Sequence, residues 1–140
     1  VDLDLQIEDD TGLSIPELFS SKGELEFRKQ ELTSFQAVCT QNPSVVSLGG
    51  GTLCNENAWQ TIPKNATVVW LDAELDTLVE RTKQAHNRPL LRENPKQVLE
   101  RLSVERAPWY AKATHRVDTT RLEPIEVAKQ IIGLIKGDPS

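Results

Sequence analysis

Residues 44–53 are S-V-V-S-L-G-G-G-T-L, a short apolar run that ends in three consecutive glycines, Gly49, Gly50 and Gly51. An apolar run bounded by turn residues is typical of a buried parallel strand, so we predict a strand over 45–48. Glycine-rich turns that follow a strand often hold phosphate. Here Thr52 comes next and no lysine follows, so the phosphate-loop pattern G-x-x-x-x-G-K-[ST] is not met. The residues of this stretch alone leave open what the glycine turn holds.

Further strands and helices are predicted on both sides of this run. Two more β-rich runs occur, at 67–71 and, more weakly, at 116–119. Ser14, Pro16 and Glu17 form a helix opening with a capping box. Other helices are predicted from Gly23 to about 38, from 72 to about 84, from 95 to about 112, and from 123 to 135. Helices that alternate with short apolar strands predict an α/β layer fold with a parallel sheet.

Three of the predicted helices have an apolar stripe that we expect to be buried. The expected buried residues are Leu25, Leu32 and Phe35 in the second helix, Val98, Leu99 and Leu102 in the fourth, and Val127, Ile131, Ile132 and Ile135 in the last. Pro108 predicts a kink or break near Ala107.

Composition limits the class of protein. The chain has 140 residues, with 38% hydrophobic and 26% charged residues, and we expect one globular domain over 1–140. The formal net charge of −5 argues against a nucleic-acid partner or an anionic membrane surface. No apolar run approaches the roughly 20 residues of a membrane span. We expect a cytoplasmic protein, or one imported into an organelle.

An acidic pair, Asp2 and Asp4, begins the chain. On an extended segment, side chains at i and i+2 point the same way. Two such carboxylates can approach Mg²⁺ and accept a hydroxyl proton. The alternative is an acidic chain end exposed to water.

Arg28 and Glu31 are spaced for an ion pair on one helix face. Glu31 would then orient the Arg28 guanidinium toward a substrate carboxylate. The alternative is a solvated surface pair of little energetic value.

Two more arginines lie in segments that suit anion binding. Arg88 is in the segment N-R-P-L-L, which we predict to be a loop. An arginine on a mobile loop can close over a transferring phosphoryl group and neutralise its developing charge. Arg106, near a helix end, is a candidate second anion clamp. The alternatives are a proline-made connection for the first segment and helix-end packing for the second.

Together these residues resemble the shikimate kinase family. The blocks are D-L-D-x-x-I-E with T-G-x-S-I-x-E-L-F at the start, G-E-x-E-F-R-x-x-E at 23–31, L-G-G-G at 48–51, R-P-L-L at 88–91 and R-A-P-x-Y at 106–110. They cover nearly all of the chain. The resemblance implies a parallel-sheet, three-layer nucleoside-monophosphate-kinase-like (P-loop kinase) fold. It implies transfer of phosphate from ATP to the 3-hydroxyl of shikimate, in the pathway to chorismate and the aromatic amino acids.

The resemblance also implies roles for individual residues. Asp4 would bind shikimate hydroxyls and act as the base, with Arg88 as the second catalytic residue, in a lid at about 84–96. The substrate region would span about 2–51, with Asp2 beside Mg²⁺. Shikimate would further contact Arg28, Gly49, Gly50, Gly51 and Arg106. The nucleotide would contact Arg81, Arg88, Arg121 and Pro124. We expect a monomer whose partners are shikimate and ATP.

Two departures from the family pattern matter. Leu122 stands where some relatives have a second basic residue beside the one that matches Arg121. The phosphate loop G-x-x-x-x-G-K-[ST], expected ahead of Asp2, occurs nowhere in the sequence. We therefore expect an amino-terminally truncated chain that lacks the first strand and the phosphate loop, about 30 residues, and that is inactive by itself. The alternatives are a non-catalytic binding or regulatory module that has lost its ATP site, and a related kinase that acts on gluconate.

Overall fold

The computed structural model describes residues 1–43, 45–83 and 94–136. These residues form two compact units, one containing residues 1–64 and the other the described residues of 65–83 and 94–136. The single domain expected from the sequence stays a prediction. In the described part of the chain, no helix has both the length and the apolar character that crossing a membrane requires.

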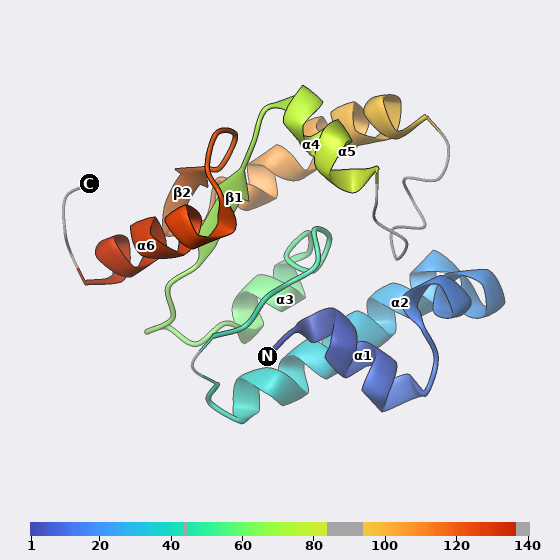
Figure 1. The fold of residues 1–140 in the computed structure, drawn as a ribbon. Coiled ribbons are helices and arrows are strands. Elements are labelled where there is room, and N and C mark those ends of the chain that lie inside the picture. The colour runs from blue at the N-terminus through green and yellow to red at the C-terminus, as the bar shows by residue number, and fades with distance from the viewer. Residues whose placement is uncertain (44, 84–93, 137–140) are drawn as a thin grey trace. The chain divides into compact units, whose positions relative to one another are not determined.

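The first unit is built from three helices, α1 (Leu3–Thr11), α2 (Ile15–Thr40) and α3 (Glu56–Thr61) (Figure 1). Apolar side chains from all three helices and from the loop before α3 form its core. The buried members are Leu3, Ile7, Ile15, Leu18, Phe27, Phe35, Val38, Leu53 and Ala58. Neither α1 nor α3 was predicted from the sequence.

The start of α2 confirms the predicted capping box. Ser14 accepts a hydrogen bond from the Glu17 backbone N–H, and the Glu17 carboxylate accepts one from the Ser14 backbone N–H. Gly23 interrupts the helix with φ 84° and ψ 169°, so the second predicted helix does begin near this residue. Its expected buried face is wrong at Leu25, which is 71% exposed. The inward stripe begins instead at Phe27 and continues through Glu31.

The predicted strand over 45–48 is reduced to a single bridge between Asp2 and Ser47. Ser47 N–H donates to the Val1 carbonyl at 2.8 Å, and Leu3 N–H donates to the Ser47 carbonyl at 2.9 Å. Pairing stops there because Asp2 is the N-cap of α1 and the chain turns into that helix. Val45 is 75% exposed, so the prediction of a buried strand is wrong in this structure.

The second unit contains a two-stranded parallel sheet with three helices. Strands β1 (Val69–Asp72) and β2 (His115–Asp118) pair in parallel, with Asp72 opposite Asp118 at their carboxyl ends. The helices are α4 (Leu75–Thr82), α5 (Pro95–Tyr110) and α6 (Pro124–Ile135). These elements confirm the predicted strands and helices of this part of the chain, with small shifts at their ends. They also confirm the α/β class with a parallel sheet.

Two details of the second unit differ from expectation. Helix α5 continues through Pro108 to Tyr110 instead of breaking at Ala107. Only the bond to the Val104 carbonyl is lost, and Val104 is 73% exposed, so water can replace that bond. In α6, Ile132 and Ile135 are 50% and 61% exposed, contrary to the predicted stripe, because the narrow two-stranded sheet covers little of the helix.

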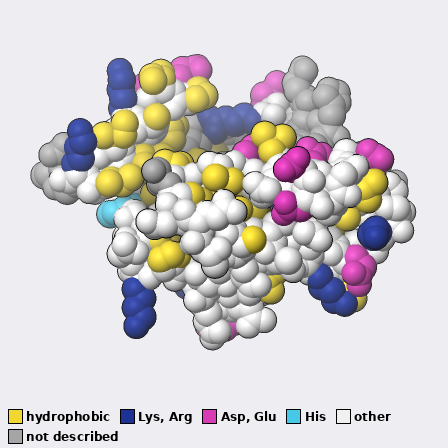
Figure 2. All heavy atoms as spheres, turned by 90° about the horizontal axis from the view of Figure 1, so that it is seen from below, with side chains coloured by type: hydrophobic (Ala, Val, Ile, Leu, Met, Phe, Trp, Pro, Cys, Tyr) yellow, Lys and Arg dark blue, Asp and Glu magenta, His cyan; other side chains and the backbone are white. Residues whose placement is uncertain are grey.

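The surface drawn in Figure 2 mixes charge types. Lysine and arginine side chains stand among acidic and hydrophobic ones on this face and do not form one continuous basic surface. The mixture agrees with the formal net charge of −5.

Candidate active site

The three glycines of the opening stretch form a tight turn that leads toward α3. The Thr52 N–H donates to the Gly49 carbonyl at 3.3 Å, and the Cys54 N–H donates to the Gly51 carbonyl at 3.2 Å. Trp59 is in α3, and its indole N–H donates to the carbonyl of Leu53, just after the glycine turn, at 2.6 Å. The glycine turn is therefore attached at its far end to α3.

A buried carboxylate connects this turn to α2. Glu31 is 3% exposed, and its two oxygens have different partners. Oε1 accepts from Arg28 Nη1 at 2.9 Å, and Oε2 accepts from Thr52 Oγ1 at 3.0 Å. The solvated surface pair is therefore wrong as an interpretation of Arg28 and Glu31. Because both oxygens are bonded, the carboxylate fixes one edge of the Arg28 guanidinium.

The guanidinium of Arg28 lies directly against the glycine turn. A Cβ atom at Gly51 would come within 2.5 Å of Arg28 Nη1, closer than real contacts of this kind. Arg28 also lies over the Phe27 ring, 5.2 Å from its centroid, and its side chain is 28% exposed. Its Nη2 also lies 3.6 Å from Oε1 of Glu24, an exposed carboxylate on the same helix. A substrate carboxylate can replace this exposed partner and bind the N–H groups that Glu31 leaves unused.

Asp4 reaches the same turn from α1. A Cβ atom at Gly49 would lie 3.3 Å from Asp4 Oδ1 and 3.6 Å from Glu31 Oε2. The first unit thus brings together Asp4, Arg28 and the glycine turn, as the sequence predicts for a substrate site. A carboxylate and a guanidinium beside bare backbone can bind a small molecule that carries hydroxyl groups and one carboxylate.

The predicted geometry of the acidic pair is wrong. Asp2 and Asp4 are not on an extended segment, because Asp2 is the N-cap of α1 and Asp4 is in its first turn. Asp2 Oδ1 accepts from the Asp4 N–H at 3.0 Å and from the Leu5 N–H at 3.4 Å. Sequence reasoning missed this because D-L-D fits a helix start as well as a strand end.

Asp2 is the residue that the family resemblance places beside Mg²⁺. Across residues 1–43, 45–83 and 94–136, no three His, Cys, Asp or Glu side chains gather into a group that could hold a metal ion. Asp2 is exposed, and Mg²⁺ commonly keeps several waters and uses one or two carboxylates plus substrate phosphates. The single carboxylate fits an ion held mainly by water and phosphate.

In the second unit, Arg81 is joined to the turn that follows β2. Its Nη1 donates to Thr119 Oγ1 at 2.8 Å, and its Nη2 donates to the Thr119 carbonyl at 2.6 Å. Arg81 is thus bonded to the turn at Thr119, which leads to Arg121 and Pro124, two other predicted nucleotide contacts. Arg121 is exposed, and Pro124 is the first residue of α6.

The two remaining predicted arginines do not belong to the described residues of the first unit. Arg106 is half-buried in α5, which belongs to the second unit. Arg88 and most of the expected lid at 84–96 lie outside the described residues.

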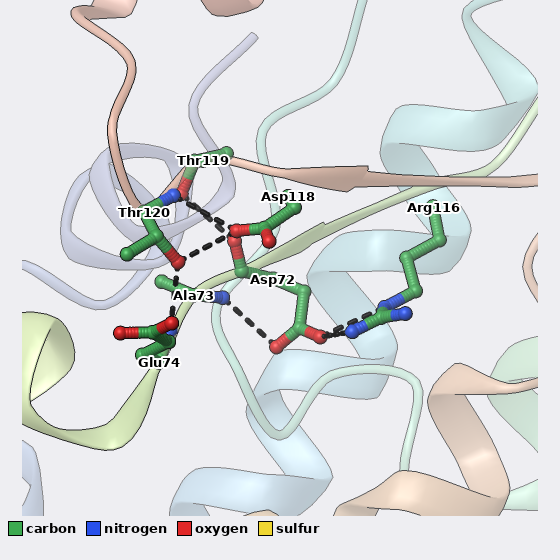
Figure 3. Close-up of polar contacts among 7 residues, drawn as sticks. All are labelled: Asp72, Ala73, Glu74, Arg116, Asp118, Thr119 and Thr120. Atoms are coloured by element: carbon green, nitrogen blue, oxygen red, sulfur yellow. Dashed lines mark hydrogen bonds and ion pairs between the residues drawn. The ribbon is translucent and has the colours of Figure 1, made fainter.

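Acidic residues at the carboxyl ends of β1 and β2 form a second polar cluster, which sequence reasoning did not single out (Figure 3). Asp72 forms an ion pair with Arg116 across the sheet. Asp118 accepts from Thr120 Oγ1 at 2.6 Å and from the Thr120 N–H at 3.0 Å, and these bonds lower the pKa of the Asp118 carboxyl. Thr120 Oγ1 in turn accepts from the Glu74 N–H at 2.9 Å. The cluster fixes the two loops that leave the sheet.

Thr52 is the site residue that sequence reasoning missed entirely. It is 1% exposed, although threonine is usually found at the surface. Its only signal in the sequence is its position immediately after the glycines. Pairing with Glu31, 21 residues earlier, cannot be inferred from local pattern.

Comparison with known proteins gives one consistent result. The family model described as shikimate kinase matches residues 1–136. A shikimate kinase of Sulfurihydrogenibium sp. is 37% identical over 136 residues, which is 97% of this chain and 81% of that protein. One from Rhizobium leguminosarum bv. trifolii is 46% identical over 114 residues, which is 81% of this chain and 58% of that protein.

Solved structures agree with the sequence comparisons. The shikimate kinase from Acinetobacter baumannii in complex with shikimate matches with a TM-score of 0.91 and 31% identity, over 97% of this chain and 77% of that one. The Aquifex aeolicus shikimate kinase matches with a TM-score of 0.81 and 34% identity, over 97% of this chain and 80% of that one. These matches confirm the P-loop kinase fold, and the chain belongs to the shikimate kinase family.

Proposed function

We propose that this protein transfers the γ-phosphoryl group of ATP to the 3-hydroxyl of shikimate, giving shikimate 3-phosphate and ADP. Family membership and the composition of the glycine-turn site support this activity. The observation that carries the proposal is the buried Glu31 carboxylate, which holds Arg28 against Gly51 while Asp4 approaches Gly49. A small hydroxy acid can therefore contact the Arg28 cation, the Asp4 carboxylate and the backbone of the glycine turn.

The substrate carboxylate is assigned to Arg28. Glu31 occupies only one edge of the guanidinium, and the planar N–H groups of arginine match a carboxylate in a two-point contact. Gly49, Gly50 and Gly51 let the ring lie against backbone, since no Cβ intervenes. Arg106 is assigned as the second carboxylate ligand, on the resemblance to the family.

Asp4 is assigned to the reacting hydroxyl. It accepts the proton of the 3-hydroxyl as that oxygen bonds to the γ-phosphorus, and the bond from phosphorus to the β–γ bridging oxygen breaks to release ADP. Phosphoryl transfer depends chiefly on positioning and charge neutralisation, which a fixed carboxylate and several arginines supply. Arg88 is assigned to the transferring phosphoryl group.

The nucleotide side is assigned from the resemblance and from the contacts of Arg81. Arg81, Arg121 and Pro124 would border the adenine, and Asp2 would hold Mg²⁺ through water. When bound, the ion neutralises charge on the phosphates. No phosphate-loop motif occurs within residues 1–140. The test uses the protein as it is expressed from its complete gene. We further propose a cytoplasmic location and a monomeric state.

A coupled assay of ADP release tests the function. The protein from the complete gene should turn over shikimate with ATP and Mg²⁺, and gluconate should give only background. Phosphorus NMR of the product should show one phosphate ester on the 3-oxygen. Tight shikimate binding without turnover would indicate the non-catalytic module instead, and turnover of gluconate alone would identify the related sugar-acid kinase.

A further inference from the structure

Thr52 lies at the point where the glycine turn meets the carboxylate that holds Arg28. Its hydroxyl is buried and donates to Glu31 Oε2 at 3.0 Å, while its backbone N–H closes the turn onto the Gly49 carbonyl. One residue therefore contacts both halves of the candidate site. Neither the family resemblance nor the comparisons assign it a role.

The bond to Thr52 determines which Glu31 oxygen serves Arg28. A carboxylate has two equivalent oxygens and can rotate to offer either one. With Oε2 occupied by Thr52, Oε1 remains for Arg28 Nη1 at 2.9 Å. A buried carboxylate oxygen without a partner is costly, so the loss of the hydroxyl favours a rearrangement in which both oxygens turn toward Arg28.

We propose that Thr52 is a positioning residue that, through Glu31, keeps Arg28 available to the carboxylate of the substrate. The inference rests on the proposed shikimate kinase activity. Without the Thr52 hydroxyl, Glu31 engages Arg28 with both oxygens and withdraws N–H groups from the substrate. Thr52 thereby tunes the affinity for the acid group, while Asp4 and the phosphoryl transfer are affected much less.

Thr52→Val is the direct test, because it removes the hydroxyl and keeps the shape of the side chain. Loss of a hydrogen bond to a charged group corresponds to roughly a tenfold or larger loss of affinity. We expect KM for shikimate to rise about tenfold, with KM for ATP and kcat within about twofold of the unchanged protein. Thr52→Ser, which keeps the hydroxyl, should restore KM.

A neutral analogue separates positioning from a merely structural role. In this analogue a hydroxymethyl group replaces the carboxylate of shikimate, and its inhibition constant is measured for both proteins. We expect Thr52→Val to leave that constant within about twofold, since no carboxylate is present for Arg28 to bind. Equal weakening of shikimate and the analogue would overturn the proposal, because it would show a general distortion of the turn.

A double-mutant cycle tests the route through Glu31. If Thr52 acts only through that carboxylate, Thr52→Val should have little further effect on KM in a Glu31→Gln background. Ser34→Ala is the matched control. Ser34 is a buried hydroxyl of the same helix that donates to Asp10 Oδ2 at 2.8 Å, away from the glycine turn. It should lower stability without changing KM for shikimate.

The outcomes separate this inference from the proposed function. If the unchanged protein does not turn over shikimate, the proposed function fails and the inference fails with it. If it does turn over shikimate and Thr52→Val has the same KM, the inference alone is overturned. Should Thr52→Val not fold, Thr52→Cys retains a weak donor and should raise KM in the same direction, to a smaller extent. An unchanged KM in that variant would equally overturn the proposal.

Discussion

Gly51 and Arg28 are in direct contact, so that a Cβ atom at position 51 would lie 2.5 Å from the Arg28 Nη1 atom. The same nitrogen is bonded to Glu31 at 2.9 Å. The absence of a side chain at position 51 therefore leaves the space that the guanidinium occupies. From the sequence, these glycines are assigned to contact with a ligand. The structure shows a further role for Gly51, which leaves room for the guanidinium of Arg28.

Gly51→Ala should displace the Arg28 guanidinium from its place beside Glu31. The obstructing atoms are at the end of a side chain that can move, so the protein should still fold. Its melting temperature should fall, because the buried Glu31 Oε1 loses its partner Arg28. We expect KM for shikimate to rise at least tenfold, the effect of losing a charge-assisted hydrogen bond. Steady-state kinetics and a thermal unfolding curve check this. An unchanged KM in a folded variant would contradict the assigned role of Arg28.

Arg28→Lys should weaken shikimate binding although the positive charge is retained. Lysine offers a point charge and cannot contact Glu31 and a substrate carboxylate with one planar group. We expect KM for shikimate to rise by about tenfold or more. Lys29→Arg is the matched control, because Lys29 is the exposed neighbour that pairs with Glu26 at 3.2 Å. Equal effects of both substitutions would count against a specific site at Arg28.

Sequence reasoning succeeded where local pattern decides the structure. Short-range signals in the sequence predict the capping box at Ser14, strands β1 and β2, and helix α6. It failed at α1, because D-L-D at a chain end fits both a strand end and a helix cap. It also failed for the buried face of α2, where the inward stripe includes Glu31, a residue that hydrophobic periodicity counts as polar.

The candidate site shows the same division. The blocks around Asp4, Arg28 and the glycines were identified from spacing and family resemblance. Thr52 was not, because its importance depends on a bond to a residue 21 positions away. The burial of Glu31 likewise arises from tertiary packing. The i, i+3 spacing of Arg28 and Glu31 predicts that they pair but not that Glu31 is buried.

Gly23→Ala should destabilise the first unit. Gly23 has φ 84° and ψ 169°, a region that residues with a side chain adopt only at a cost of about 1–3 kcal/mol. The free energy of unfolding from urea titration should fall by about that amount. Lys22→Ala, at the exposed preceding residue within the helix, is the control and should stay within about 0.5 kcal/mol. A neutral Gly23→Ala would mean that the helix runs through this point.

Arg81→Met should affect the nucleotide and not the acceptor. Arg81 donates to the Thr119 hydroxyl and carbonyl, which holds the turn after β2 in place. If this segment borders the adenine, KM for ATP should rise about tenfold while KM for shikimate changes less than about twofold. Lys83→Met, an exposed cation that pairs with Glu80, is the control. A rise confined to shikimate would refute the assignment.

Asp118 should titrate below its ordinary range, and Thr120 is the reason. Hydrogen bonds from the Thr120 hydroxyl and backbone N–H stabilise the carboxylate and lower its pKa from 3.8. A lowered pKa in the folded protein means that the stabilisation is present above the unfolded pKa and is lost as pH falls through the folded value. Thr120→Val should raise the Asp118 pKa, as carboxyl-carbon NMR titration can show, whereas Thr120→Ser should not. The stability difference between Thr120→Val and the unchanged protein should shrink as pH falls below about 4. A difference that is constant with pH would show that Thr120 acts only through its bond from Glu74.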